Sequence, residues 1–136
     1  MMRRTTIYES DFSQVDFESE NNLIITTYKP ATALMSDEDY RKEIKNQLAL
    51  MGNYKPEFAL EDLRDLSFVL SIELQEWGRT YVRNALVEVG IRKTANIYSQ
   101  KFFVHLSVET QAEGIKEPAI SFFENEEKAR RWLFEN

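Results

Sequence analysis

Three acidic residues follow the short apolar run 58–60, and their types could do chemistry. Glu61, Asp62 and Asp65 come at the end of a predicted buried strand, which is where α/β sheets usually bind ligands. Two close carboxyls can shift each other's pKa and serve acid–base chemistry, or they can hold a hard cation. No second acidic motif at a defined spacing accompanies them. We therefore interpret the cluster as a solvated turn in which Asp65 bonds local backbone, and we predict no metal site.

Ser71 precedes the longest stretch of helical pattern. A phosphate on its hydroxyl would be well placed, because free N–H groups and the helix dipole favour an anion at a helix N-terminus. The simpler interpretation is a helix N-cap, which contributes about 1 kcal/mol. Because Ile72 and Glu73 follow it, we favour the cap and do not expect phosphorylation at Ser71.

His105 is the one histidine of the chain, which excludes a multi-histidine metal site. No Ser or Cys nucleophile motif accompanies it. Glu109 lies four residues further on and would pair with a protonated imidazole on a helix. We expect a structural or surface histidine.

The strand pattern dominates the first 28 residues. Residues 6–8, 15–17 and 23–28 are β-branched or aromatic, and short polar breaks separate them, as in an antiparallel meander. Residues 58–60, 93–98 and 119–123 predict three further strands.

Four segments predict helices. Ser36 and three following acidic residues form a good helix start, with an apolar stripe at Tyr40, Ile44, Leu48 and Met51 and a left-handed cap at Gly52. A helix over 72–89 ends at Gly90. Its stripe includes Leu74, Trp77 and Tyr81, aromatics that we expect in the core rather than at a stacking site.

The remaining two helices are predicted over 100–113, opened by Ser99 or Gln100, and after Asn125, with Ala129, Trp132 and Leu133 on one face. The order βββαβαβαβα predicts an α/β fold: a mixed, largely parallel sheet with packed helices, as a single domain over residues 1–136.

Composition narrows the class of protein. The chain has 136 residues, 43% of them hydrophobic, and no cysteine, which excludes disulfide scaffolds, iron–sulfur sites, thiol nucleophiles and thiolate zinc sites. The net charge of −6 speaks against a general nucleic-acid binder. Apolar runs are far shorter than the roughly 20 residues that span a bilayer, and acidic residues occupy the place of a signal peptide's apolar stretch. We expect a soluble, cytoplasmic protein.

Several blocks of sequence carry a family likeness: residues 62–68, 73–77, 89–95, 106–110 and 122–133. Together they resemble the STAS-like family, in the branch that groups anti-anti-sigma (sporulation AA-like) and Sec14-like domains and is common in the Bacteroidetes. The resemblance runs from about Ile7 to Leu133. It implies a mixed sheet with helices, no cofactor and no established enzymatic activity.

The anti-anti-sigma members carry a phosphoacceptor in an Asp-Ser-Ser/Thr-Gly pattern, in the loop that enters the helix after the fourth strand. The matching residues here are Leu70, Ser71, Ile72 and Glu73, so only the first hydroxyl of the pattern remains. We do not carry over the phosphorylation switch or the sigma-factor role.

Three functions are consistent with this sequence. The first is a non-catalytic regulatory or protein-interaction module, which would have an exposed apolar patch, no deep cavity and an unknown protein partner or a second copy of itself. The second is a carrier or sensor of a small apolar or amphipathic ligand, with an apolar pocket between helix and sheet. The third is an enzyme built on Asp62 and Asp65. By fold-level analogy, any ligand is predicted near the strand ends, among Asp62, Phe68, Ser71 and Ser99.

Overall fold

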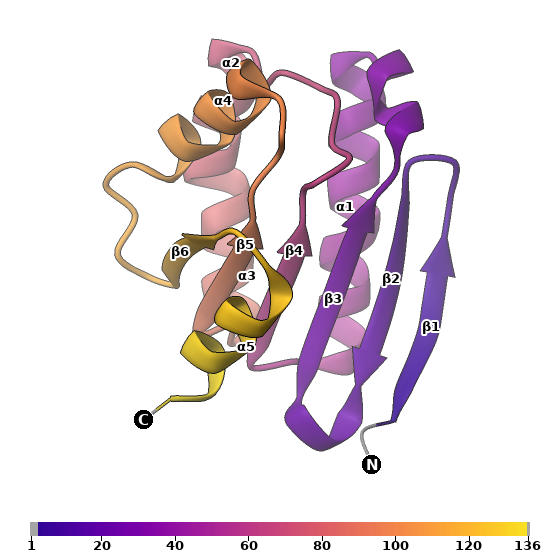
Figure 1. Ribbon diagram of the computed structural model, residues 1–136, viewed down its shortest axis with the longest axis vertical. Helices are drawn as coiled ribbons and strands as arrows, with labels where there is room; N and C mark the ends of the chain where they lie inside the picture. The colour runs from indigo at the N-terminus through magenta and orange to yellow at the C-terminus, as the bar shows by residue number, and fades with distance from the viewer. Residues whose placement is uncertain (1–2, 136) are drawn as a thin grey trace.

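A six-stranded mixed sheet forms the centre of the computed structural model, which describes residues 3–135 (Figure 1). The strands lie side by side in chain order: β1 (Arg4–Glu9), β2 (Ser13–Glu18), β3 (Leu23–Tyr28), β4 (Phe58–Asp62), β5 (Lys93–Ile97) and β6 (Ala119–Phe123). The first three are antiparallel, and β4, β5 and β6 run parallel to β3. The predicted α/β fold with a largely parallel sheet is confirmed.

The helices divide between the two faces of the sheet. Because β3 to β6 are neighbours in chain order, each right-handed crossover passes over the same face. That face carries α1 (Asp37–Tyr54), the continuous helix formed by α2 (Ile72–Trp77), η3 (Gly78–Val82) and α3 (Arg83–Val89), and α4 (Phe102–Ala112). The last helix, α5 (Glu126–Phe134), packs on the opposite face, in front of the sheet in Figure 1. Two short 3-10 turns, η1 (Ser19–Asn21) and η2 (Pro30–Leu34), flank β3.

Side-chain alternation along the strands supplies both faces with apolar residues. Leu60 and Ala95 pack with Ala129 and Leu133 beneath α5. Ala59, one residue before Leu60, packs instead on the α1 side of the sheet. The next two residues of β4 follow the same alternation, so Glu61 faces α1 and Asp62 faces α5.

Three of the predicted helix starts are confirmed. The Ser36 hydroxyl accepts the backbone N–H of Asp39 in a capping box, and Asn125 caps α5 through the N–H of Lys128. Ser71 caps α2 by accepting the N–H of Leu74 at 3.2 Å.

The predicted cap at Gly52 is wrong. Helix α1 continues to Tyr54, and Lys55 takes the left-handed conformation with φ of 51°. The extra residues bring the ring of Tyr54 within 5.1 Å of Phe17 on β2, so tertiary packing favours a longer helix than the glycine indicates.

The predicted core stripe of the second helix is only partly right. Leu74 is fully buried, but Tyr81 is 48% exposed and stacks on Trp77. The cause is η3, a π-helical turn in the middle of the helix. A π turn uses an extra residue, which rotates the following side chains around the axis, so that Val82 and Leu86 face inward after it.

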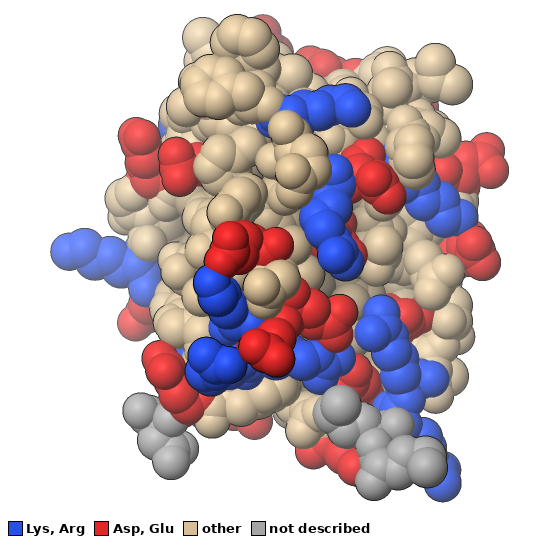
Figure 2. Space-filling model, in the orientation of Figure 1, with Lys and Arg blue, Asp and Glu red and all other residues tan. Residues whose placement is uncertain are grey.

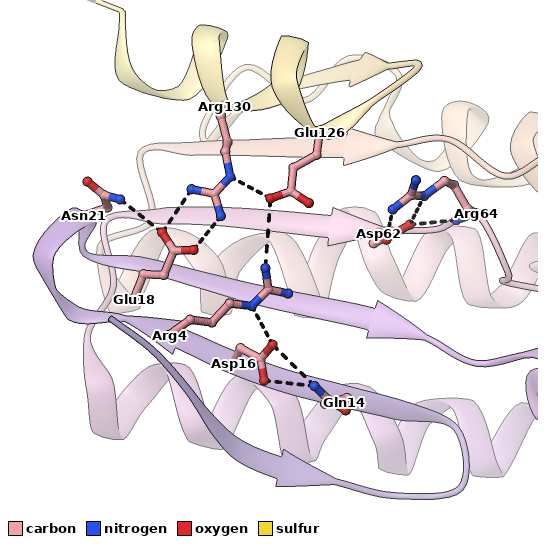
Figure 3. Close-up of polar contacts among 9 residues, drawn as sticks. All are labelled: Arg4, Gln14, Asp16, Glu18, Asn21, Asp62, Arg64, Glu126 and Arg130. Carbon is pink, nitrogen blue, oxygen red and sulfur yellow. Dashed lines mark hydrogen bonds and ion pairs between the residues drawn. The ribbon is translucent and has the colours of Figure 1, made fainter. Parts of the chain in front are cut away.

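An ion-pair network holds α5 against the sheet (Figure 3). Arg130 binds the carboxylate of Glu18, on β2, through both terminal nitrogens and also pairs with Glu126 at 2.7 Å. Glu18 is only 1% exposed, and its hydrogen bonds with Arg130 keep its pKa below the ordinary value despite burial. Arg4 extends the network by bonding Asp16 at 2.8 Å. Glu18 is therefore a buried carboxylate with a cationic partner.

The α5 face carries charges of both signs, mixed over its lower half, whereas uncharged atoms gather at the top of the view, over the ends of α2 and α4 (Figure 2). Within residues 3–135, no helix is long and apolar enough to cross a membrane.

Candidate functional site: a cavity with one carboxyl on its wall

A cavity of about 120 Å³ lies between the sheet and the helices α1, η3, α3 and α4. For comparison, an apolar cavity of about 150 Å³ is large enough to hold benzene. Its apolar wall includes Ile44, Leu48, Val82, Leu86, Val108 and Ile120, and its polar groups include Tyr28, Gln47, Glu61, Thr94, Asn96 and Gln111. A mainly apolar hollow with a few converging polar groups is the usual form of a small-molecule site.

The mouth of the cavity lies between α3 and the loop that joins α4 to β6. Arg83 and Ile115 line both the cavity and an open hollow on the surface, which also includes Arg79, Glu113 and Lys116. A ligand entering there would pass from the surface toward Glu61 on the sheet.

Gly78 explains how η3 and α4 approach each other beside the cavity. A Cβ atom at this position would lie 2.1 Å from the side-chain oxygen of Gln111, on α4. Glycine therefore leaves room for Gln111, and both residues line the cavity. π turns also occur frequently at functional sites, and this one forms part of the cavity wall.

Glu61 is the acidic residue that faces this cavity. Protein atoms surround the carboxyl, and the surface that this half-buried residue keeps is open to the cavity. Its nearest hydrogen-bond donor is the hydroxyl of Tyr28, at 3.4 Å. Glu61 makes no ion pair with any residue of the described range 3–135.

Burial raises the pKa of Glu61 to about 7, against weaker lowering by the hydroxyls of Tyr28 and Thr26. Thr26 lies opposite Glu61 on β3, close enough to act electrostatically although its hydroxyl makes no hydrogen bond of good geometry. Burial, and to a lesser extent Glu61, also raises the pKa of Tyr28 and Tyr40 above the ordinary tyrosine value. Both tyrosines therefore stay protonated at neutral pH, where Glu61 itself titrates.

A buried chain of hydrogen bonds fixes Tyr28 beside Glu61. The hydroxyl of Tyr28 lies 3.1 Å from the side-chain oxygen of Gln47, whose nitrogen lies 3.5 Å from the hydroxyl of Ser13. Ser13 donates in turn to Glu43, which is buried and also accepts from Ser10 at 2.7 Å. Because each group has a partner, Tyr28 is positioned before any ligand binds.

Thr94 adds a second polar group to the wall. It is buried on β5, and its hydroxyl makes no hydrogen bond within residues 3–135. A buried hydroxyl without a partner costs free energy, so such groups often mark functional sites.

Of the four residues predicted to bind a ligand, Asp62 and Ser71 have polar partners elsewhere. Asp62 points to the α5 side and accepts two hydrogen bonds from the guanidinium of Arg64, at 2.7 and 3.0 Å (Figure 3). Ser71 caps α2, and its hydroxyl lies 3.3 Å from a carboxylate oxygen of Asp37. A phosphate on Ser71 would meet that carboxylate.

The other two predicted residues have packing roles. The Phe68 ring is buried and stacks on Tyr40 with centroids 5.2 Å apart. Ser99 is buried, donates to the carbonyl of Leu66 at 3.1 Å and accepts the N–H of Lys101 at 3.1 Å. None of the four lines the cavity.

The remaining candidates also separate. Asp65 is exposed. His105 lies 3.6 Å from Glu109, as the helical spacing indicates, and its ring packs against Tyr98 and Phe122. Within residues 3–135, no group of three or more His, Cys, Asp or Glu side chains could hold a metal ion.

Sequence reasoning missed the role of Glu61 because it grouped this residue with the solvated acids of the following turn. The structure extends β4 to Asp62, so Glu61 is a strand residue. The signal was available in the alternation: Glu61 is two residues from Ala59 and shares its face of the sheet.

The chain matches no protein-family model, no curated protein and no solved structure. The STAS-like resemblance therefore rests on the sequence blocks and stays a prediction.

Replacing Glu61 by Gln is expected to stabilise the protein above neutral pH. A folded-state pKa of about 7, above the ordinary 4.5, means that the folded protein binds this proton more tightly than the unfolded chain. Stability is therefore lost as pH rises from about 4.5 to about 7, and the loss is complete above the folded pKa. We expect Glu61→Gln to gain about 2 kcal/mol at pH 8 and much less at pH 5, as measured by urea denaturation.

Asp62→Asn is the matched control, because it changes the neighbouring carboxyl on the opposite face. It should not reproduce the gain at pH 8. A Glu61→Gln protein that is less stable than the wild type at pH 8 would contradict the assignment of Glu61 to an unpaired, buried position.

Proposed function

We propose that this protein is a non-catalytic, STAS-like binding module that senses or carries a small, largely apolar ligand between its sheet and its helices. The cavity of about 120 Å³ is the observation that carries this proposal. Its apolar wall supplies affinity, and its few polar groups supply orientation. The proposal needs no cofactor.

The energetics of Glu61 support a ligand site over a packing defect. A well-packed core has few voids and pairs its buried polar groups. Here the void, the carboxyl without a cation and the unbonded hydroxyl of Thr94 occur at one place. Features that cost stability and lie together are typical of sites that selection keeps for function.

The ligand of this proposal lies on the α1 side of the sheet, against Glu61. It would not contact Asp62, whose side chain points to the α5 side, and it would leave the Ser71 cap undisturbed. A regulatory role is supported by the placement of α4, which contributes Val108 and Ala112 to the cavity and carries an exposed apolar end.

That exposed end favours a second function, association with a protein partner. Ile72 is 83% exposed, Phe102 68% and Phe103 70%, and Val69 and Leu106 are also exposed. The N-termini of α2 and α4 meet there, since the backbone N–H of Leu70 donates to Ser107. Exposed apolar side chains in one region are typical of interaction surfaces.

A second copy of the chain is the partner that can be tested directly. We expect sedimentation coefficients to rise with protein concentration, and Phe103→Ser to reduce this rise. Phe134→Ser, on α5, is the control because it removes an exposed ring outside the surface. A monomer at every concentration would remove self-association and leave the apolar surface to a different protein.

Ligand binding in the cavity is tested with toluene, a neutral probe of the right size. We expect toluene to shift the amide NMR signals of residues that line the cavity, with a Kd on the order of 1 mM or tighter. Ala112→Leu fills part of the cavity and should abolish the shifts. Ala49→Leu, an exposed position on α1, is the matched control and should preserve them.

Shifts of equal size in Ala112→Leu would place the binding outside the cavity. If neither toluene nor the polar probes described below bind, the proposed function is wrong.

A further inference from the structure

We infer that the ligand of this cavity is a small organic cation, an arylalkyl or alkyl amine whose ammonium group pairs with Glu61. The inference rests on the proposed function, since it names the chemical class of ligand that the cavity takes. Four observations carry it: the charge of the wall, the free acceptor capacity of Glu61, the size of the space and the chemistry of its mouth.

The wall is negative because Glu61 has no cation to pair with in residues 3–135. Arg83 is the basic residue of the cavity lining, and its guanidinium bonds outward, to the carbonyl of Glu117 at 2.8 Å and the side chain of Asn84 at 3.1 Å. A carboxylate in a low-dielectric space is stabilised strongly by a cation brought to it, and the attraction is greater than at the surface.

Glu61 also retains room for a ligand's donors. A carboxylate can accept about four hydrogen bonds, and Glu61 is bonded by the Tyr28 hydroxyl alone, at 3.4 Å. That hydroxyl has one hydrogen, and Gln47 is nearer to it, at 3.1 Å. An ammonium group offers three donors, which suits a carboxylate with this much free capacity.

The other groups around Glu61 do not neutralise it. Tyr28, on β3, and Tyr40, on α1, are held protonated, and Glu43, further along α1, adds negative charge near Tyr28. From α4, β5 and β6 the cavity is lined by uncharged residues. A ligand that carries a negative charge would therefore meet only repulsion at the depth of Glu61.

The size and surface of the space favour a ring or a short chain behind the ammonium group. A volume of about 120 Å³ is close to that of a cavity which holds benzene. The rings of Tyr40 and Phe122 line it, and aromatic faces attract cations.

The mouth carries the opposite sign and has to be weighed against this. Arg79, Arg83 and Lys116 border the outer hollow together with Glu113. Arg79 already pairs with Glu76 at 3.0 Å, and charges in contact with solvent are screened by salt. They act on the rate of entry more than on affinity, whereas the unscreened charge of Glu61 decides which ligand is held.

Three probes of one shape test the inference: benzylamine, benzyl alcohol and benzoate, each titrated into the wild-type protein and followed by amide NMR. At pH 8 we expect benzylamine to bind at least tenfold more tightly than the other two. At pH 6 its affinity should fall about tenfold, because the Glu61 carboxyl, with a pKa near 7, becomes mostly protonated while the amine stays charged.

Glu61→Gln should bind benzylamine at least tenfold more weakly at pH 8 and keep its affinity for benzyl alcohol. Asp62→Asn should behave as wild type with all three probes.

The outcomes separate the two proposals. If toluene or benzyl alcohol binds in the cavity but benzylamine has no preference at pH 8, or keeps its affinity in Glu61→Gln, the cation inference is overturned and the proposed function stands. Tighter binding of benzoate, lost in Arg83→Gln, would also overturn it and assign the ligand class to an anion held at the mouth. If no probe binds, both proposals fail.

Discussion

Glu61 is a carboxyl group that the fold encloses without a cation, and the account of this protein depends on that constraint. Moving a charge out of water is costly unless a partner of opposite sign repays the cost. The chain demonstrates the usual solution on the other face of its sheet, where Glu18 is buried against the guanidinium of Arg130. The absence of an equivalent partner for Glu61 within residues 3–135 leaves a group whose pKa is raised to about 7 and whose surface is open to a cavity.

The topology brings about this contrast. Strand order follows chain order from β3 to β6, so the crossover helices all cover one face, and α5 is left to cover the other. Adjacent residues of β4 then meet different environments: Asp62 pairs with Arg64 on the α5 side, and Glu61 faces the cavity. The π turn η3 and Gly78 shape the helical wall opposite Glu61, where α3 and α4 would otherwise close on the sheet. The α5 face is held by ion pairs and packing, and the other face combines a packed core with a cavity.

The sequence predicts the fold well because its elements are marked by local chemistry. Caps at Ser36, Ser71 and Asn125 and the strand pattern of residues 23–28 agree with the structure. The site was harder to predict, because its features depend on tertiary contacts. The π turn at Gly78–Val82 has no clear local signature, so Tyr81 was expected in the core. Glu61 was read with its acidic neighbours, although the register of β4 separates it from them. The four residues predicted at the strand ends instead cap, pair and pack, and the cavity lies on the face that the crossover helices cover.

The most direct test of this account is the titration of the Glu61 carboxyl itself, followed by carbon NMR of the side chain in the wild-type protein. The account requires a midpoint near pH 7, clearly above those of the exposed glutamates. A midpoint near the ordinary value of 4.5 would mean that water or a cation already stabilises the charged form. The carboxyl would then not be the unpaired group on which the proposed site depends.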